Sequence, residues 1–166
     1  MTAGARTSDE IGPLHTLMLR PLMEADATPA YASWFSDPET RRWIATPTPT
    51  VDTCRDYIRA HHGEDVLLWA FEVNGQHAGN VKVERSADGS EATLGLLIAP
   101  VWRGRGVGAA AIRQAVQWCF EVWGVGRVRA GVHPFNTRSM RVFEKANFKI
   151  ADLDPPRVWL HLEKTK

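Results

Sequence analysis

The segment Arg103-Gly104-Arg105-Gly106-Val107-Gly108-Ala109 places three glycines and two arginines between an apolar run and an amphipathic run. Glycines at alternate positions let successive backbone N–H groups turn toward one point, and a helix starting after them adds partial positive charge. Arginine guanidiniums supply paired donors for phosphate oxygens. An ordinary glycine turn with solvated arginines is the alternative. The order of strand, loop and helix favours a loop that binds pyrophosphate.

The spacing excludes two common phosphate-binding loops. A nucleoside-triphosphate loop ends in Gly-Lys-Ser/Thr, whereas this one ends in Val107-Gly108-Ala109. A dinucleotide fold needs Gly-x-Gly-x-x-Gly after the first strand of a parallel unit, whereas this chain has Gly104-x-Gly106-x-Gly108 after an expected hairpin.

The pattern Arg103-x-x-Gly106-x-Gly108 resembles the loop with which the GNAT superfamily of N-acetyltransferases wraps the pyrophosphate of acetyl-coenzyme A. Asn136-x-x-Ser139, leading through Phe143-Glu144-Lys145 to Asn147-Phe148, is similar to a second motif of that superfamily. The resemblance covers about residues 16–162 and implies the GNAT fold, with acetyl-CoA as the co-substrate.

Shorter stretches of the first half resemble the RimJ/RimL-like branch, and especially bacterial amino-sugar N-acyltransferases. They are Leu19-Arg20-Pro21, the Trp34–Trp43 segment around Asp37-Pro38-Glu39, and Gly79-Asn80-Val81-Lys82.

The resemblance also assigns residues to the cofactor. Backbone groups of Leu96, Leu97 and Ile98 would meet the pantetheine arm, and Asn136 with Ser139 would lie at the cofactor. Arg138 or Arg141 would meet the 3′-phosphate, although a solvated helix face explains Arg141 equally well. The side chains of the two loop arginines would reach the phosphates. The backbone amides of the whole loop would hold the pyrophosphate, and its residues are Arg103, Gly104, Arg105, Gly106, Val107, Gly108 and Ala109.

The implied reaction is attack of a neutral amine on a thioester, so an ammonium with a pKa near ~10 must first lose a proton. Many relatives carry a glutamate where this chain has Thr93. Glu91 lies on the same strand face about 7 Å away, a distance that water could bridge. His133, at the end of a later strand, is a second candidate for moving the proton. We therefore name Glu91, His133 and Thr93 as candidate catalytic residues, with a buried or solvated structural role as the alternative.

The general acid of the family is also absent, because Phe143 stands where relatives that use one place a tyrosine. A thiol has a pKa near ~8.5, so the thiolate is a tolerable leaving group without an acid. Catalysis would then rest mostly on holding the amine and the thioester in register.

The acceptor site is expected in the first half of the chain, where Trp34, Trp43 and Asn80 are candidate binding residues. Aromatic walls stack on sugar rings, and an amide binds hydroxyls. Core packing, or a position at the edge of a strand, is the alternative for each. Trp43 is the one we expect to line the pocket.

The residue patterns predict an α/β (α+β) scaffold, a mixed and mostly antiparallel sheet with flanking helices. The resemblance adds the expectation of an acyl-CoA site where two strands splay. Residues 1–15 read as a mobile arm and 16–166 as one domain. The expected elements are strands near 16–20, 67–73, 81–83, 91–98, 128–132, 148 and 158–162. Helices are expected from Asp26 to Phe35, from Asp37 to Ile44, from Thr50 to His62, over about fifteen residues that end before Gly124, and from Thr137 to Ala146. In the third of these helices, Tyr57 and Ile58 are expected to face inward. Gly95, in the middle of the strand at 91–98, is expected to mark a bulge or a close backbone approach.

Composition bounds the partners. The chain has 166 residues, 44% of them hydrophobic, and a net charge of +1, which steers neither nucleic acid nor an anionic membrane. No leader or spanning segment is evident, so we expect a cytoplasmic protein. Cys54 and Cys119 read as buried hydrophobes, and no metal site is expected. A homodimer is possible.

The sequence therefore predicts an N-acetyltransferase that moves an acetyl group from acetyl-CoA to a primary amine of a small molecule, with an amino sugar favoured. Acetylation of a protein N-terminus, or a CoA-binding module without catalysis, is the alternative.

Overall fold

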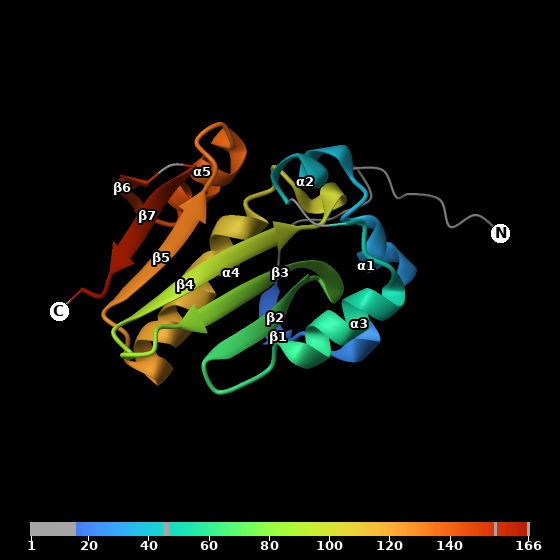
Figure 1. Ribbon diagram of the computed structural model, residues 1–166, viewed down its shortest axis with the longest axis horizontal. Coiled ribbons are helices and arrows are strands. Elements are labelled where there is room, and N and C mark those ends of the chain that lie inside the picture. The colour runs from blue at the N-terminus through green and yellow to red at the C-terminus, as the bar shows by residue number, and fades with distance from the viewer. Residues whose placement is uncertain (1–15, 45–46, 155, 166) are drawn as a thin grey trace.

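One seven-stranded sheet in the order β1-β2-β3-β4-β5-β7-β6 organises the part of the chain that the computed structural model describes, residues 16–44, 47–154 and 156–165 (Figure 1). Neighbouring strands are antiparallel except β4 and β5, which are parallel. The predicted mixed sheet is confirmed. The arm predicted for residues 1–15 lies outside the described residues. The strands are β1 (Leu17–Pro21), β2 (Val66–Val73), β3 (Gln76–Arg85), β4 (Glu91–Ile98), β5 (Arg127–Val132), β6 (Lys149–Asp154) and β7 (Arg157–Glu163).

Helices cover both faces of this sheet. They are the short turns η2 (Glu24–Asp26) and η3 (Pro100–Trp102), the π-helical η4 (Cys119–Trp123), and α1 (Pro29–Ser33), α2 (Pro38–Trp43), α3 (Val51–Ala60), α4 (Val107–Trp118) and α5 (Thr137–Lys145). Within the described residues, no helix is long and apolar enough to cross a membrane.

The β2–β3 hairpin turns at Asn74 and Gly75, whose φ angles of 51° and 75° are left-handed, as a two-residue turn of this kind requires. Its register shifts between Phe71 and Glu72, so that Phe71 faces Gly79 and Glu72 faces His77. The bulge predicted at Gly95 is wrong, since β3 and β4 pair without a shift there and space is open around it. The close approach lies at Gly79, where an added Cβ would sit 2.2 Å from the Phe71 ring.

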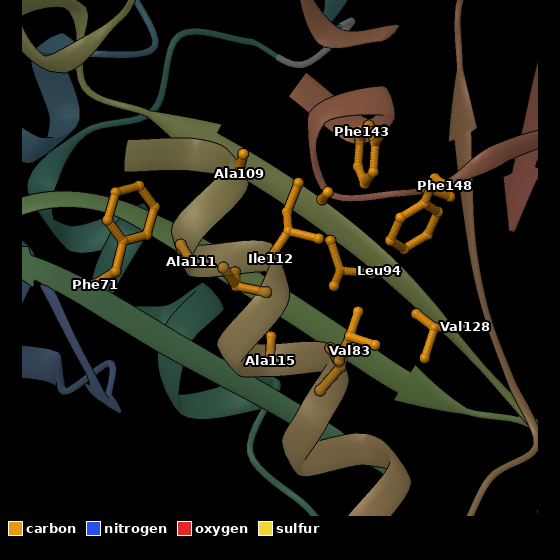
Figure 2. Close-up of a cluster of buried hydrophobic side chains, with 14 of the residues drawn as sticks. Phe71, Val83, Leu94, Ala109, Ala111, Ile112, Ala115, Val128, Phe143 and Phe148 are labelled. Atoms are coloured by element: carbon orange, nitrogen blue, oxygen red, sulfur yellow. The ribbon is translucent and has the colours of Figure 1, made fainter. Parts of the chain in front are cut away.

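Helix α4 packs on one face of the sheet and builds the larger core. Ile112 and Ala115 point from α4 onto Val83, Leu94 and the neighbouring strands (Figure 2). Ala111 and Ala115 of α4 are fully buried, as is Ile112. Because alanine side chains are small, the helix can lie close to the strands. The predicted apolar face of this helix is confirmed, and η4 continues it to Gly124, whose φ of 69° ends the helix.

The opposite face carries a second core beneath α1 and α3, which includes Leu68 and Ala70 of β2. Ile58 is buried there as predicted, but Tyr57 is 44% exposed and does not face this core. Thr28, and not Asp26 as predicted, caps the first helix, because Pro29 fits the first helical position directly after it. That helix ends at Ser33, two residues short of the prediction.

Helix α5 begins at Asn136, whose Oδ1 accepts a hydrogen bond from the Ser139 amide, and its end is followed by Asn147 with a φ of 68°. Asparagine is one of the few residues with a side chain that tolerates this left-handed conformation. The predicted helices that start at Asp37 and Thr50 are likewise capped by those side chains.

Strands β4 and β5 pair only from Glu91 to Thr93 and from Arg127 to Arg129, although they continue to Ile98 and Val132. They separate beyond these pairs, on the side where α5 and the loop before α4 lie (Figure 1). This split is where the sequence predicts the cofactor.

Candidate functional site

Three adjoining cavities follow the split. The phosphate cavity, of about 420 Å³, lies against the loop before α4 and the side of α5. The middle cavity, of about 120 Å³, shares Ile98, Arg138 and Val142 with it. The acceptor cavity, of about 410 Å³, shares Leu96 and Leu97 with the middle one. Together they form a track from the loop, through the split, to the sheet face that α1 and α3 cover.

The loop at the start of the track offers unused backbone donors. Among the described residues, none is an acceptor for the backbone amides of Gly104 and residues 106–109, and Gly106 caps α4 without a side-chain bond. Gly104 and Gly106 have φ angles of 74° and 77°, which allow consecutive amides to face one concavity. This arrangement fits a pyrophosphate, as the loop pattern predicts.

Gly108 has a different function, because it lets α4 approach its neighbours. A Cβ at this position would lie 2.6 Å from Ile98 Cδ1 and 3.0 Å from Val142 Cγ1. The glycine therefore sets how closely the loop can lie to β4 and α5.

Cationic side chains of α5 line the phosphate cavity. Arg138, Arg141 and Lys145 are spaced three and four residues apart, which places them on one side of the helix. They form a local positive surface on a chain that is nearly neutral overall. Both arginines considered for the 3′-phosphate thus border the cavity.

Arg103 lines both the phosphate cavity and the middle cavity, and its guanidinium is bonded to two side chains of α2. Its Nη1 lies 2.7 Å from Asp37 Oδ2, and its Nη2 donates to Thr40 Oγ1 at 2.6 Å. Burial would raise the pKa of Asp37, but the hydrogen bonds from Arg103 and from the Thr40 amide outweigh it and lower that pKa. The guanidinium thus attaches the N-terminus of α2 to the loop. Arg105 packs its guanidinium over Trp102 and donates Nε to the Val101 carbonyl.

The middle cavity collects most of the other predicted cofactor residues. Leu96, Leu97, Ile98, Asn136 and Ser139 line it together with Arg138. Trp43 and Glu39 of α2 complete it, with Trp43 Nε1 donating to Glu39 Oε1 at 3.2 Å. Trp43 therefore borders the track beside the split and not the acceptor cavity, in which it was expected.

The candidate bases lie at different depths. Glu91 is in the paired part of β4, where Arg129 donates to its Oε1 at 3.3 Å and Arg127 lies 3.8 Å from Oε2. It lines none of the three cavities, and its catalytic role stays a prediction. Thr93 is exposed at the last pair before the split. His133 is exposed after β5, with its ring 5.2 Å from that of Trp43.

No thiol or phenol replaces the missing acid at the Phe143 position. Phe143 is 3% exposed and packs edge-on against Phe148, in agreement with a core role. Both cysteines are buried as predicted, and burial raises the pKa of Cys119 to about 12. Among the described residues, no group of three or more His, Cys, Asp or Glu side chains is arranged to hold a metal.

The acceptor cavity is mainly apolar and aromatic. Asn80, predicted to bind the acceptor, lines it and is 7% exposed. Trp34, also predicted, does not: it packs edge-on against Tyr31 and His77 outside the cavity. The further lining residues are Tyr31, Phe35, Ile44, Pro47, Pro49, Thr53, Cys54, Tyr57, Leu68, Lys82, Gly95, Leu96 and Leu97.

Sequence reasoning did not single out Tyr31 or Glu39, which line the acceptor and middle cavities, and it favoured a solvated role for His77. Nothing in the spacing of Tyr31 distinguishes it from a core aromatic, and the bulge that brings His77 to Asn80 carries no motif. Glu39 and Trp43 are four residues apart in a predicted helix, so their side chains could have been predicted to lie next to each other.

The split sheet and the amide-lined loop are the geometry of an acyl-group transferase that draws on a phosphate-bearing donor. The chain belongs to the acetyltransferase (GNAT) domain family, whose profile matches residues 16–149. It is therefore an acetyltransferase, as predicted. No curated protein matches the chain.

Solved structures similar to this one share the fold at low sequence identity. An aminoglycoside acetyltransferase AAC(6′)-Ib, solved with coenzyme A and kanamycin, is 22% identical, with 90% of this chain and 95% of that one covered and a TM-score of 0.75. RimJ from Mycobacterium smegmatis, in complex with CoA-disulfide, is 18% identical over 89% and 81% of the chains, with a TM-score of 0.78. A spermidine N-acetyltransferase chimera from Vibrio cholerae and hSSAT is 17% identical over 89% and 95%, with a TM-score of 0.72.

Proposed function

We propose that this enzyme transfers an acetyl group from acetyl-CoA to a primary amine of a small molecule. The observation that supports it most is the continuous track from the glycine-rich loop, where the amides of residues 106–109 have no acceptor among the described residues, to a separate apolar cavity. A long donor with a diphosphate at one end and a thioester at the other fits such a track. Relatives of the same fold were solved with coenzyme A.

In this proposal each part of the track has one task. The amides of residues 104–109 hold the pyrophosphate, and Arg138, Arg141 or Lys145 meets the remaining phosphate. The backbone of residues 96–98 binds the pantetheine arm, and Asn136 and Ser139 border it. The thioester then lies in the middle cavity, with its carbonyl open to the acceptor cavity.

The reaction forms one N–C bond and breaks one C–S bond. The substrate ammonium first loses one proton to become a neutral amine, which attacks the thioester carbon, and the thiolate leaves. The nitrogen loses a second proton after the N–C bond has formed, and the base or water accepts each proton. We propose Glu39 as that base, because it is the only carboxylate among the described residues lining the three cavities. Water entering the middle cavity can protonate the thiolate, since no acidic side chain stands at Phe143.

The lining of the acceptor cavity favours a compact monoamine. Its described residues include one cation, Lys82, and no carboxylate. Aminoglycosides and spermidine, named for the relatives above, carry several ammonium groups that need carboxylate partners. An amino sugar with one amine remains the favoured acceptor, with the rings of Tyr31, Phe35 and Tyr57 available for stacking. A protein N-terminus is the alternative. A cytoplasmic location and a homodimer also remain predictions.

The test is thiol release from acetyl-CoA with monoamino sugars, other hydroxylated amines, aminoglycosides, spermidine and N-terminal peptides, alongside calorimetric binding of CoA. Turnover restricted to monoamines supports the proposal. Fast turnover of polyamines or peptides contradicts the acceptor class, and CoA binding without turnover of any amine contradicts the transferase activity itself.

A further inference from the structure

Tyr31 is one of the residues that line the acceptor cavity, and it is only 3% exposed. Its hydroxyl accepts a hydrogen bond from Asn80 Nδ2 at 2.7 Å. Within the described part of the chain, this is the only hydrogen bond at the hydroxyl. The oxygen is therefore bound, while the phenolic hydrogen has no protein acceptor. A buried donor without an acceptor is costly, which points to a ligand atom as its partner.

His77, on the other side of Asn80, determines that Asn80 donates to Tyr31 and does not accept from it. Its Nε2 lies 2.8 Å from Asn80 Oδ1 and 3.1 Å from the Gly79 carbonyl oxygen. Both neighbours are acceptors, so Nε2 carries the hydrogen in this arrangement. That in turn keeps the oxygen of the Asn80 amide toward His77 and its NH₂ group toward Tyr31.

The backbone places these three side chains together. Residues three apart on a regular strand point to opposite faces, yet His77 and Asn80 are hydrogen-bonded. The register shift opposite Phe71 and Glu72 accounts for this, because one extra residue in β3 reverses the alternation. The His77 ring then stacks on the Tyr31 ring at 5.6 Å and meets Trp34 at 4.8 Å. Trp34 thus serves this chain of contacts and not the acceptor cavity.

The chain orients a proton and does not transport one. An amide such as that of Asn80 neither gains nor loses a proton readily, so no proton passes from Tyr31 to His77. Burial raises the pKa of Tyr31, which keeps the phenol protonated at neutral pH. The hydroxyl is accordingly a fixed donor and not a base.

We infer that Tyr31 donates a hydrogen bond to an oxygen of the acceptor molecule, so that the enzyme selects amines that bear a hydroxyl or carbonyl oxygen close to the reacting nitrogen. Tyr31 determines specificity, and Asn80 and His77 are positioning residues. This inference rests on the proposed function, because it takes the cavity to be the acceptor site.

The surroundings make this selection strong. Phe35, Ile44 and Leu68 give the cavity apolar walls. Two of the other polar side chains there already have partners: Thr53 donates to the Thr50 carbonyl, and Lys82 pairs with Glu84 at 3.3 Å. A hydrocarbon amine would leave the Tyr31 donor unsatisfied, and sites that hydrogen-bond a substrate oxygen reject analogues without it.

The experiment compares 2-aminocyclohexanol with cyclohexylamine, two amines that differ by one hydroxyl, with glucosamine as a third probe. In the wild-type enzyme we expect kcat/KM to favour the hydroxylated amine by about 10- to 100-fold. Tyr31→Phe should bring this ratio close to one, mainly by raising KM for 2-aminocyclohexanol, without changing CoA affinity. The matched control is Tyr57→Phe, which changes an exposed tyrosine of the same cavity and should keep the ratio.

Variants of the positioning residues separate orientation from packing. Asn80→Ala should lower the ratio as Tyr31→Phe does. His77→Leu should lower it, whereas His77→Gln retains a side-chain N–H donor and should restore much of it. No preference in the wild-type enzyme, or a preference that persists in Tyr31→Phe, would overturn the inference.

The proposed function can fail separately, as CoA binding with no turnover of any amine. The inference is then decided by calorimetry of the N-acetylated forms of the two cyclohexyl amines with the CoA-loaded protein. Tighter binding of the hydroxylated form that is lost in Tyr31→Phe supports it, and equal binding of the two forms overturns it.

Discussion

Two glutamates of this chain show how position separates a reactive carboxylate from a structural one. Glu91 is on the expected strand but is held by Arg129 and Arg127 outside the cavities. Glu39, which comes from α2, borders the middle cavity beside Trp43. Strand alternation correctly gave the face of Glu91, but only the tertiary structure shows which carboxylate reaches the split.

We expect Glu39→Gln to lower kcat/KM by about 10²- to 10⁴-fold, the range for loss of a general base. The loss should shrink for a weakly basic amine that is already neutral at the assay pH, because that substrate needs no proton removed first. Steady-state kinetics with a strongly and a weakly basic amine measures this.

Glu91→Gln is the matched control, with an expected change in kcat/KM below about threefold and a stability loss of about 1 kcal/mol from the partly exposed ion pairs. If the two variants exchange these effects, Glu91 and not Glu39 is the base.

At the scale of elements, helix α2 is held by Arg103, a contact that the loop motif does not predict. The motif predicts Arg103 as a phosphate ligand, and the structure shows in addition that its guanidinium holds Asp37 and Thr40 at the border of the phosphate cavity. The sequence does predict the Asp37 cap from local chemistry. The partner of that cap lies 66 residues away and depends on where the loop folds back.

A double-mutant cycle with Asp37→Ala and Arg103→Ala should give a coupling free energy of about 1–3 kcal/mol by urea unfolding. Because the pKa of Asp37 is lowered in the folded protein, the coupling should be complete above about pH 5 and lost as the pH falls below the ordinary aspartate value of about 3.9. The two single variants should weaken CoA binding equally. A much larger CoA defect in Arg103→Ala alone would instead identify a direct phosphate contact.

Two glycines on paired strands should respond in opposite ways. Gly79→Ala places a Cβ 2.3 Å from the Leu97 carbonyl oxygen and 2.2 Å from the Phe71 ring, so unfolding should become easier by about 3 kcal/mol or more. Gly95→Ala meets no atom within 4 Å and lies at the acceptor cavity, so stability should change by less than about 1 kcal/mol while KM for the amine rises. Thermal unfolding and kinetics of both variants check this.

For the whole molecule, sequence patterns were sufficient for the fold, because the hairpin turn, the α4 stripe and the glycine loop all agree on one topology. The hairpins and the mixed sheet follow from these local signals, whereas the split was expected from the family resemblance. The acceptor side was less accessible, since it is built by short helices and a bulge whose contacts are nonlocal. Trp34 and Tyr57 were misplaced for this reason.

Donor binding should stabilise the molecule as a unit. CoA at about 100 times its Kd adds about 2.7 kcal/mol, which for a domain of this size corresponds to a Tm increase of roughly 5–10 °C. Calorimetric melting should show a clearly smaller increase at the same CoA concentration for Arg141→Ala, which changes the phosphate cavity, and an unchanged one for Arg55→Ala, which changes an exposed arginine of α3. Equal shifts in both variants would exclude a role of Arg141 in CoA binding.

The split between β4 and β5 leaves two open ladder edges in the middle of the molecule. Each can pair with any extended chain of amides, and the pantetheine arm, which contains two amides, occupies this place in the proposed complex. The donor would then act as a temporary eighth strand that joins the two halves of the sheet. The amide hydrogens of β4 beyond Thr93 that face β5, unlike those in the ladder with β3, should therefore exchange quickly without CoA and slowly with it, and the unliganded enzyme should be the form most prone to self-association.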